Sequence, residues 1–414
     1  MSDPGSPTCT FVTHRRRLDL HRRWSPVLGE AAVVAEIEAL DRAVEEVDGR
    51  RFVPTPFSAR PELTLADGDD GSADTAGIEI WVKDETGNVA DSHKGRHLFG
   101  VAVDHRLAAR DGRPVEGRYA IASCGNAAVA AAVVAAAAGR ELEVFVPTWA
   151  DVDAVARIEA LGARVVACPR VPGTVGDPAY LAFREAVERG AVPFSCQGTD
   201  TPGALDGGRT LAWEMGEVVD RLDRVVVQVG GGALATCVAR GLAEEVAEGR
   251  LASLPCFHAV QPVGNHPLAR AWDRLVAELL ETTAPTDNAD RAAAAGRLGR
   301  MGEAERRVVT ARLRSTPDRY MWPWEDEPRS VATGILDDVT YDWIDIVDAM
   351  LASGGFPLVA GEEDLITAHR LGRAATGIDV SATGTAGLAG ARLLAGLGVP
   401  DAGERVAVLF TGRR

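Results

Sequence analysis

A lysine stands where the sequence passes from a strand pattern into a helix pattern. Residues Ile78–Val82 alternate branched or aromatic residues with others, and residues 97–103 place apolar residues on one helical stripe. Lys94 therefore lies near a helix N-terminus, where the helix dipole favours anions over cations. A Schiff base to an anionic cofactor would account for a cation at this point. Surface lysines also begin helices, so the lysine alone does not decide between the two interpretations.

A second candidate segment follows the predicted strand at Tyr119–Ser123. It consists of Ser123, Cys124, Gly125, Asn126 and Ala127. A glycine-containing turn with exposed amides and with serine and asparagine side chains suits an anion or a carboxylate. Serine and asparagine are also favoured helix N-caps, and this alternative stays open.

A third candidate follows the apolar residues 225–227 and consists of Gly230, Gly231, Gly232, Ala233 and Leu234. Successive glycines allow backbone amides to close on a phosphate at the start of a helix. The spacing from Gly230 to Ala235 also fits a dinucleotide fingerprint, which requires an acidic residue at the end of the next strand. That strand ends in Gln261-Pro262, which disfavours a nicotinamide cofactor.

The fourth candidate is Thr411, directly after the predicted strand Arg405–Phe410. A hydroxyl at the end of a buried strand can hydrogen-bond a ring nitrogen. It can equally serve as an ordinary strand-end cap.

Together, these four stretches resemble the pyridoxal-phosphate enzymes of the tryptophan-synthase β fold, also called fold type II. The lysine stretch is similar to S-F-K-x-R of that family, the asparagine turn to S-x-G-N, the glycines to G-G-G-G-L and Thr411-Gly412 to a terminal T/S-G. Order and spacing agree over residues 51–414. The segments 207–210, 259–262 and 384–388 resemble the threonine-synthase and threonine-dehydratase branch most closely.

The resemblance implies the cofactor pyridoxal 5'-phosphate and a role for each matching residue. Lys94 would carry the cofactor and then move the substrate's Cα proton. Ser123, with the amides of residues 124–127, would hold the substrate carboxylate, and Asn126 would hydrogen-bond the cofactor's phenolic oxygen. The amides of residues 230–234 would bind the phosphate. Thr411 would face the pyridine nitrogen without holding it protonated, which favours expulsion of a β- or γ-substituent over transamination.

Two residues depart from the family pattern. His93 stands where phenylalanine is usual, and Gly95 follows the lysine. We expect His93 to pack under the cofactor; tuning of the pKa of Lys94 and contact with the substrate are the alternatives.

Strands and helices alternate along the chain, which is typical of βαβ units with helices on both faces of a parallel sheet. Ligands of such sheets bind beyond the carboxyl ends of the strands. We expect an α/β fold with two parallel-sheet three-layer domains, the smaller inserted in the larger. The predicted strands include Tyr119–Ser123, Glu141–Val146, Ala163–Cys168, Val192–Cys196, Asp223–Val229, Cys256–Gln261 and Arg405–Phe410, and the predicted helices include Asn126–Ala138, Asp151–Leu161, Asp177–Arg189, Ala233–Ala247, Tyr341–Ala352, Glu362–Ala375 and Gly384–Leu397.

The expected domain organisation has four parts. Residues 1–50 form an N-terminal extension with one helix at Glu30–Val47. Residues 51–115 and 195–414 form the large cofactor-binding domain, with an exposed loop at Asp67–Ala76. Residues 116–194 form a small mobile domain that closes over the substrate. Residues 281–330 interrupt the alternation and predict an inserted helical arm, whose aromatic residues either cover a site or interface or pack in the core.

Composition limits the classes of protein and partner. The formal net charge of −16 over 414 residues disfavours nucleic acid as a partner. The six cysteines are scattered, without metal-ligand spacing, and indicate reduced thiols and no metal site. The apolar run from Ala127 to Gly139 is too short to span a bilayer, and no secretory signal is recognisable. We therefore expect a cytoplasmic protein without nucleic-acid or membrane partners. The resemblance implies a small amino acid as substrate, and we expect a homodimer.

The expected reaction is elimination or replacement on a small L-amino acid. Conversion of O-phosphohomoserine to threonine, the threonine synthase reaction, is the nearest single match. Threonine or serine dehydration and a β-replacement synthase are the alternatives within the enzyme class. A catalytically idle relative that serves as a scaffold is the alternative outside it.

Overall fold

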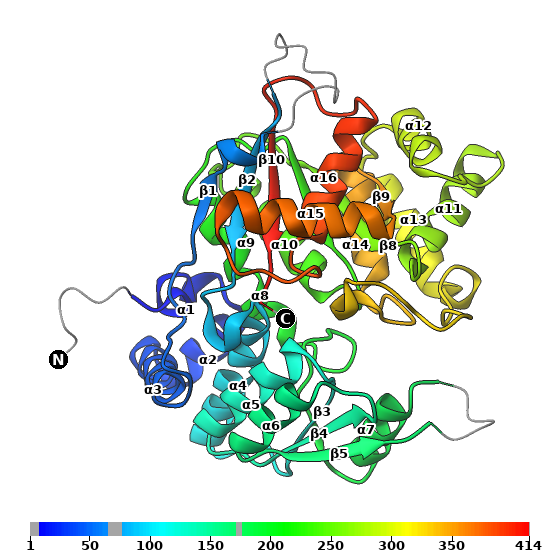
Figure 1. Ribbon diagram of the computed structural model, residues 1–414. Helices are drawn as coiled ribbons and strands as arrows, with labels where there is room; N and C mark the ends of the chain where they lie inside the picture. Colours follow the sequence, from blue (N-terminus) through cyan, green and yellow to red (C-terminus); the bar gives the residue numbers. More distant parts are fainter. Residues whose placement is uncertain (1–7, 65–76, 171–175, 414) are drawn as a thin grey trace. The chain divides into compact units, whose positions relative to one another are not determined.

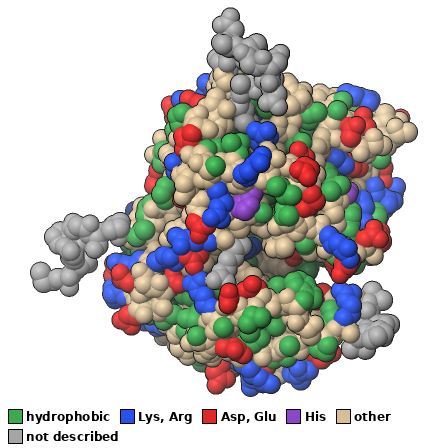
Figure 2. Space-filling model, in the orientation of Figure 1, with side chains coloured by type: hydrophobic (Ala, Val, Ile, Leu, Met, Phe, Trp, Pro, Cys, Tyr) green, Lys and Arg blue, Asp and Glu red, His purple; other side chains and the backbone are tan. Residues whose placement is uncertain are grey.

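The computed structural model describes residues 8–64, 77–170 and 176–413 (Figure 1). The exposed loop predicted at Asp67–Ala76 lies outside the described residues. Within those residues, no helix combines the length and apolar character that a membrane crossing requires. On the face drawn in Figure 2, acidic and basic side chains are interspersed. The chain divides into two compact units, one comprising Pro56–Thr86 and Ala212–Arg414, the other Met1–Thr55 and Gly87–Leu211.

The first unit contains a six-stranded sheet with the order β1-β2-β10-β7-β8-β9. Strand β1 runs antiparallel to β2, and all other neighbouring pairs are parallel. Valine, alanine and leucine dominate β7 and β10, as expected for strands buried on both faces. The strands are β1 (Phe57–Ala59), β2 (Glu79–Asp84), β7 (Arg224–Gln228), β8 (Cys256–Pro262), β9 (Pro357–Ala360) and β10 (Arg405–Phe410).

Helix α16 packs across β7, β8, β9 and β10, and α15 packs on α16 (Figure 1). Helix α10 packs on β7 and α14 packs on β8. Helices α11 and α12 both pack on β9. The helices of this unit are α9 (Thr210–Gly216), α10 (Ala233–Ala247), α11 (Pro267–Leu280), α12 (Asn288–Leu298), α13 (Glu303–Ser315), α14 (Trp343–Ser353), α15 (Glu362–Thr376) and α16 (Ala386–Gly396). Of α9, the first two residues belong to the other unit.

The second unit contains a parallel four-stranded sheet with the order β5-β4-β3-β6. Its strands are β3 (Tyr119–Ala122), β4 (Leu142–Pro147), β5 (Arg164–Cys168) and β6 (Val192–Pro193). Its helices are α1 (Thr10–Thr13), α2 (Asp19–Leu28), α3 (Glu30–Asp48), α4 (Lys94–Arg110), α5 (Asn126–Ala137), α6 (Val152–Ala160), α7 (Pro178–Glu188) and α8 (Ala204–Gly208). Both sheets confirm the α/β fold class.

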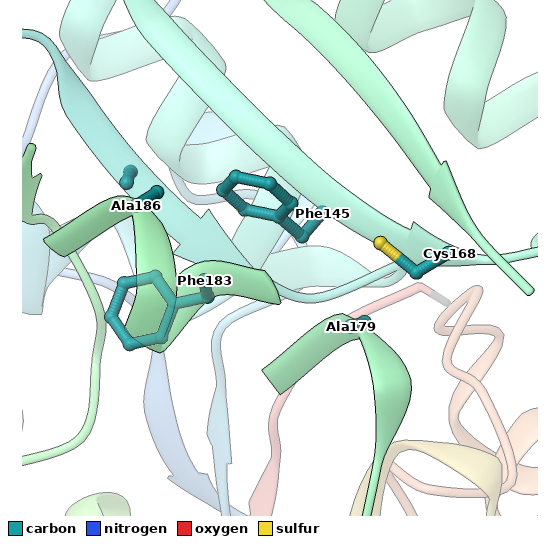
Figure 3. Close-up of a cluster of buried hydrophobic side chains, with 6 residues drawn as sticks. Phe145, Cys168, Ala179, Phe183 and Ala186 are labelled. Atoms are coloured by element: carbon teal, nitrogen blue, oxygen red, sulfur yellow. The ribbon is translucent and has the colours of Figure 1, made fainter. Parts of the chain in front are cut away.

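One face of the four-stranded sheet is covered by α7 through a small apolar cluster (Figure 3). Phe145 and Cys168 from the sheet meet Ala179, Phe183 and Ala186 of the helix. Side chains alternate between the faces of a strand, so the neighbouring residues of β4 point away from α7. Helix α5 packs on β3 and β4, and α6 packs on β5 and on α5.

The N-terminal residues are part of the second unit. The predicted helix at Glu30–Val47 is confirmed as α3, but residues 8–28 add two helices that the sequence did not indicate. The carboxylate of Asp206 accepts hydrogen bonds from the amides of Asp19 and Leu20 at 2.9 and 3.0 Å, and so satisfies the first turn of α2. Phe11 and Trp24 are buried.

The predicted alternation is confirmed, with most element ends within two residues of expectation. Strand β6 ends at Pro193, three residues early, and β9 was not predicted because an apolar run of four residues carries little periodicity. Residues 281–330 do contain helices α12 and α13, followed by Tyr320, which is fully buried and donates to Glu278 at 2.9 Å. The division into a large and a small mobile domain stays a prediction.

Helices α4 and α8 approach each other so closely that only glycine fits at position 207. A Cβ there would stand 2.1 Å from the backbone oxygen of Arg96. We expect Gly207→Ala to lower the free energy of unfolding by roughly 1–3 kcal/mol, because the helix backbones must separate. Urea denaturation measures the effect. Gly296→Ala, whose Cβ enters open space inside α12, is the matched control and should not destabilise the protein.

Candidate active site

Lys94 is the first residue of α4 and is half-buried. Its amide donates to the Oγ of Ser92 at 3.4 Å, and its carbonyl accepts from the thiol of Cys196 at 3.8 Å. His93 precedes it, is buried, and meets the ring of His97 edge-on with 5.7 Å between centroids. The start of the helix is therefore fixed on both sides of the lysine backbone.

The turn before Lys94 is strained. Ala90 and Asp91 have φ values of 57° and 59°, which costs a residue other than glycine about 1–2 kcal/mol. Buried charges stabilise this conformation: the Asp48 carboxylate accepts from the Ala90 amide at 3.0 Å. Arg157 and Arg50 approach the Asp91 carboxylate at 2.8 and 2.9 Å. The strain lies directly beside the lysine, as is common at functional sites.

The groups beside Lys94 do not neutralise its charge. Among the described residues, no carboxylate lies within ion-pairing distance of its ammonium group. Burial lowers the pKa of His97 to about 3, and the charge of Lys94 adds to the effect. Burial also raises the pKa of the Cys196 thiol to about 11. Both neighbours are thus uncharged at neutral pH, and an anionic ligand would be favoured beside Lys94.

The chain contains only one other lysine, Lys83. It lies in β2, is fully buried, and holds an ion pair with Glu214 at 2.6 Å. The carboxylate of Glu85 lies 4.0 Å away. A fully buried amine held in such a pair is not accessible to the carbonyl group of a ligand. Lys94 is therefore the lysine that can form a covalent bond with an aldehyde.

The asparagine turn leads into α5, whose N-cap is Gly125 and which has no side-chain cap. The Oγ of Ser123 accepts from the Gly125 amide at 3.4 Å. Residues 123–127 are half-exposed, and the amide of Ala127 has no acceptor among the described residues. Since neither polar side chain occupies the N-cap position, the turn fits a carboxylate better than it fits an ordinary cap.

The glycine loop joins β7 to α10. Gly232 has a φ of 105° and is the N-cap of α10, which again has no side-chain cap. The backbone amides of residues 230–235 have no acceptor within the described parts of the chain; the first amide bonded back into the helix is that of Thr236, to the Gly232 carbonyl at 3.0 Å. All these residues except Gly231 are buried. Buried amides require an acceptor, and a phosphate group at the helix N-terminus supplies one.

A second segment covers this loop. The Asp342 amide donates to the Gly231 carbonyl at 3.1 Å. One carboxylate oxygen of Asp337 lies 2.2 Å from the position that a Cβ on Gly230 would occupy. The backbone Cα of Ile335 would lie 2.9 Å from the same Cβ, so position 230 requires glycine, and an acidic side chain lies against the loop.

Thr411 follows β10 and is buried. Its Oγ1 lies 3.0 Å from the Nε2 of Gln228, the last residue of β7. Sequence reasoning missed Gln228, although a polar residue between Val227 and Val229 at the end of an apolar strand was a usable signal.

The structure groups the candidate residues in two pairs. The Lys94 turn and the asparagine turn belong to one unit, in which α4 packs against α5. The glycine loop and Thr411 belong to the other, at the carboxyl ends of the neighbouring strands β7 and β10. None of the six cysteines, all within the described residues, forms a disulfide. The described residues contain no group of three His, Cys, Asp or Glu side chains that could hold a metal ion.

The chain matches the family described as pyridoxal-phosphate dependent enzyme over residues 69–412. It is 24% identical over 340 residues to threonine synthase from Methanocaldococcus jannaschii, covering 81% of this chain and 70% of that protein. The fold is similar to threonine deaminase isoform 2 from Solanum lycopersicum, with a TM-score of 0.62, 16% identity, and coverage of 93% and 90%. It is also similar to a pyridoxal 5'-phosphate-dependent aspartate racemase, with a TM-score of 0.62, 18% identity, and coverage of 92% and 95%.

We expect borohydride reduction of the protein loaded with pyridoxal phosphate to fix the cofactor on Lys94. Peptide mapping by mass spectrometry locates the label, and Lys83 is the internal control. Lys94→Ala should take up no label and should lose at least roughly 10²–10⁴-fold in turnover, because both attachment and proton transfer are lost. A label on Lys83 would contradict the assignment.

The burial of His97 predicts a pH dependence of stability. Its Nδ1 donates to the Ala204 carbonyl at 3.0 Å, and its folded-state pKa of about 3 lies below the unfolded value. Below about pH 6.5 the unfolded chain binds a proton that the folded protein does not, so stability falls with pH. His97→Asn keeps a donor without a titrating group. Between pH 7 and 5 it should lose about 1–2 kcal/mol less than the wild type in urea denaturation. Equal losses in both proteins would contradict the neutral His97.

Proposed function

The chain belongs to the family of pyridoxal-phosphate dependent enzymes, and from this premise we propose that it is a threonine synthase-like enzyme that converts O-phosphohomoserine to threonine. Elimination or replacement on an amino acid is the broader reaction class of these enzymes. The observation that supports the specific proposal is the similarity to a threonine synthase over 81% of the chain. A cytoplasmic location and a homodimer are part of the proposal.

The described groups fit the cofactor. The amides of residues 230–235 lack acceptors among the described residues, and all of these residues except Gly231 are buried, which suits its phosphate. Lys94 is the lysine whose ammonium group has no carboxylate partner among the described residues, which suits its aldehyde. Thr411 offers a buried hydroxyl, which suits its ring nitrogen. Bound pyridoxal phosphate supplies an electron-withdrawing ring that stabilises negative charge at the substrate's Cα.

The chain's own residues would divide the remaining work. The Nζ of Lys94 would accept the Cα proton of the substrate. No neighbouring carboxylate competes for Lys94 within the described residues, and the neutral His97 and Cys196 do not neutralise it. The turn at residues 123–127 orients the substrate by its carboxylate, with Ser123 and Asn126 as side-chain partners. A hydroxyl at position 411, in place of a carboxylate, favours loss of a substituent over transamination.

An ammonia-lyase acting on threonine or serine is the second candidate function. The carboxylate of Asp337 lies against the glycine loop. A phosphorylated substrate brings a second dianion to the site beside the cofactor phosphate, and a carboxylate close to that substrate would oppose its binding. Two like charges 4 Å apart cost about 1 kcal/mol in water and about 4 kcal/mol near a protein surface. A hydroxy amino acid has no such charge on its side chain.

The two functions are separated by supplying O-phosphohomoserine and L-threonine to the loaded enzyme in parallel. Phosphate and threonine from the first substrate support the proposal. We expect a kcat/KM for O-phosphohomoserine at least tenfold above that for threonine dehydration. Production of 2-oxobutanoate from threonine, with O-phosphohomoserine inert, would establish the ammonia-lyase instead. Lys94→Ala is the control for both reactions, and a loaded protein inert toward every amino acid tested would indicate a scaffold.

A further inference from the structure

A cavity of about 760 Å³ lies at the amino ends of β3, β4 and β5, within the unit that contains the four-stranded sheet. It begins where the apolar cluster between α7 and the sheet ends, since Ala186 belongs to both (Figure 3). Small molecules commonly occupy cavities of roughly 300–1,000 Å³. The turn at residues 123–127 follows the carboxyl end of β3, so the cavity lies at the opposite edge of the same sheet.

Charged side chains of both signs line this cavity. Two of them neutralise each other, because Arg164 and Glu143 form an ion pair at 3.1 Å across β5 and β4. A third is engaged with the backbone: Arg140 donates to the carbonyl group of Val115 at 2.9 Å and to that of Gly117. The charged lining residues are Arg118, Arg140, Glu141, Glu143, Arg164 and Arg189.

Arg118 and Glu141 carry opposite charges that are not paired. They directly precede the registered pair Tyr119 and Leu142, so they lie side by side at the starts of two neighbouring strands. Neighbouring side chains of opposite charge commonly pair across strands. Among the described residues, neither the Arg118 guanidinium nor the Glu141 carboxylate has a hydrogen-bond or ion-pair partner. One cationic and one anionic group are thus available in the same cavity.

Two helix ends add to the charge pattern. Helices α5 and α7 both end at the cavity, where Gly139 and Gly190 contribute to its lining. The carboxyl end of a helix carries partial negative charge and favours cations. A phosphate ligand would meet these helix ends together with the carboxylates of Glu141 and Glu143, which oppose its binding. A ligand that carries both an ammonium and a carboxylate group matches the charges of the cavity.

We propose that this cavity is a binding site for a free α-amino acid. Arg118 binds the carboxylate, since a guanidinium can pair with a carboxylate through two parallel hydrogen bonds. Glu141 binds the ammonium group beside the carboxyl ends of α5 and α7. Arg189 pairs only with Glu185, at 3.5 Å and with both side chains exposed, so it is available to a further carboxylate of the ligand. An amino acid bound here leaves residues 123–127 free for the substrate.

The test is isothermal titration calorimetry on the cofactor-loaded protein after borohydride reduction, which prevents an added amino acid from bonding to the cofactor. Glycine, L-threonine and L-aspartate are the probes, and at least one of them should bind. Arg118→Gln and Glu141→Gln should each weaken that binding about tenfold or more, the effect of one lost charge-assisted hydrogen bond. Both side chains are exposed, so both variants should keep the fold.

The matched control is Arg297→Gln, the same substitution at an exposed arginine of α12 that has no partner among the described residues. It should bind the amino acid as the wild type does. Acetate and methylammonium each carry one of the two charged groups and should bind at least about tenfold more weakly than the amino acid.

Two results would overturn the amino-acid site: none of the three amino acids binds, or wild type and Arg118→Gln bind them equally. Inorganic phosphate that binds more tightly than the amino acids, and whose binding Arg118→Gln weakens, would also overturn it, because the cavity would then be an anion site. The reduced protein does not turn over, so none of these results depends on the proposed function.

Discussion

The backbone amides of residues 230–235 impose the constraint on which the rest of the candidate site depends. A buried N–H without an acceptor costs about 1–3 kcal/mol. Among the described residues none of these six amides has an acceptor, and five of the six residues are buried. An arrangement of this kind suits an anionic ligand, whose oxygens would supply the acceptors. It also requires a particular chain around it: a buried parallel strand before the loop, a helix with no side-chain cap after it, and glycine at position 230, where a Cβ would meet Asp337. The dipole of α10 adds a further preference for an anion.

The second feature of the candidate site is that the two lysines differ in burial and in ion pairing. Lys83 is enclosed beside two carboxylates and forms part of the interior of its unit. Lys94 stands at the start of a helix, where the dipole opposes its charge, beside a histidine and a thiol that burial keeps neutral. A strained turn at residues 90–91 lies directly before this lysine. Asp48, Arg50 and Arg157 stabilise the turn. The protein thus tolerates local strain beside a half-buried lysine, as the proposed covalent role of Lys94 would require.

Local patterns in the sequence predicted much of this arrangement. Strand-to-helix junctions placed Lys94, the asparagine turn and the glycine loop correctly relative to α4, α5 and α10, because each signal spans a few residues. Contacts between distant segments left no such signal. The capping of α2 by Asp206, nearly 190 positions away in the chain, made the N-terminal residues part of a folded unit. The hydrogen bond between Gln228 and Thr411 forms only because β7 and β10 lie side by side. The close approach of Asp337 to Gly230 depends on a segment more than 100 residues downstream.

That last contact puts an acidic side chain against the loop, which bears on the choice of substrate in the proposed function. One Asp337 carboxylate oxygen lies 2.2 Å from the position of a Cβ on Gly230, and the Ile335 Cα lies 2.9 Å from it. Glycine at position 230 thus leaves room for the covering backbone and for an acidic side chain. The segment from Ile335 to Asp342 packs on the loop and so sets the charge beside it. In the proposed function, a neutral residue at position 337 would remove an acidic charge from this segment and would thereby favour a phosphorylated substrate over a hydroxy amino acid.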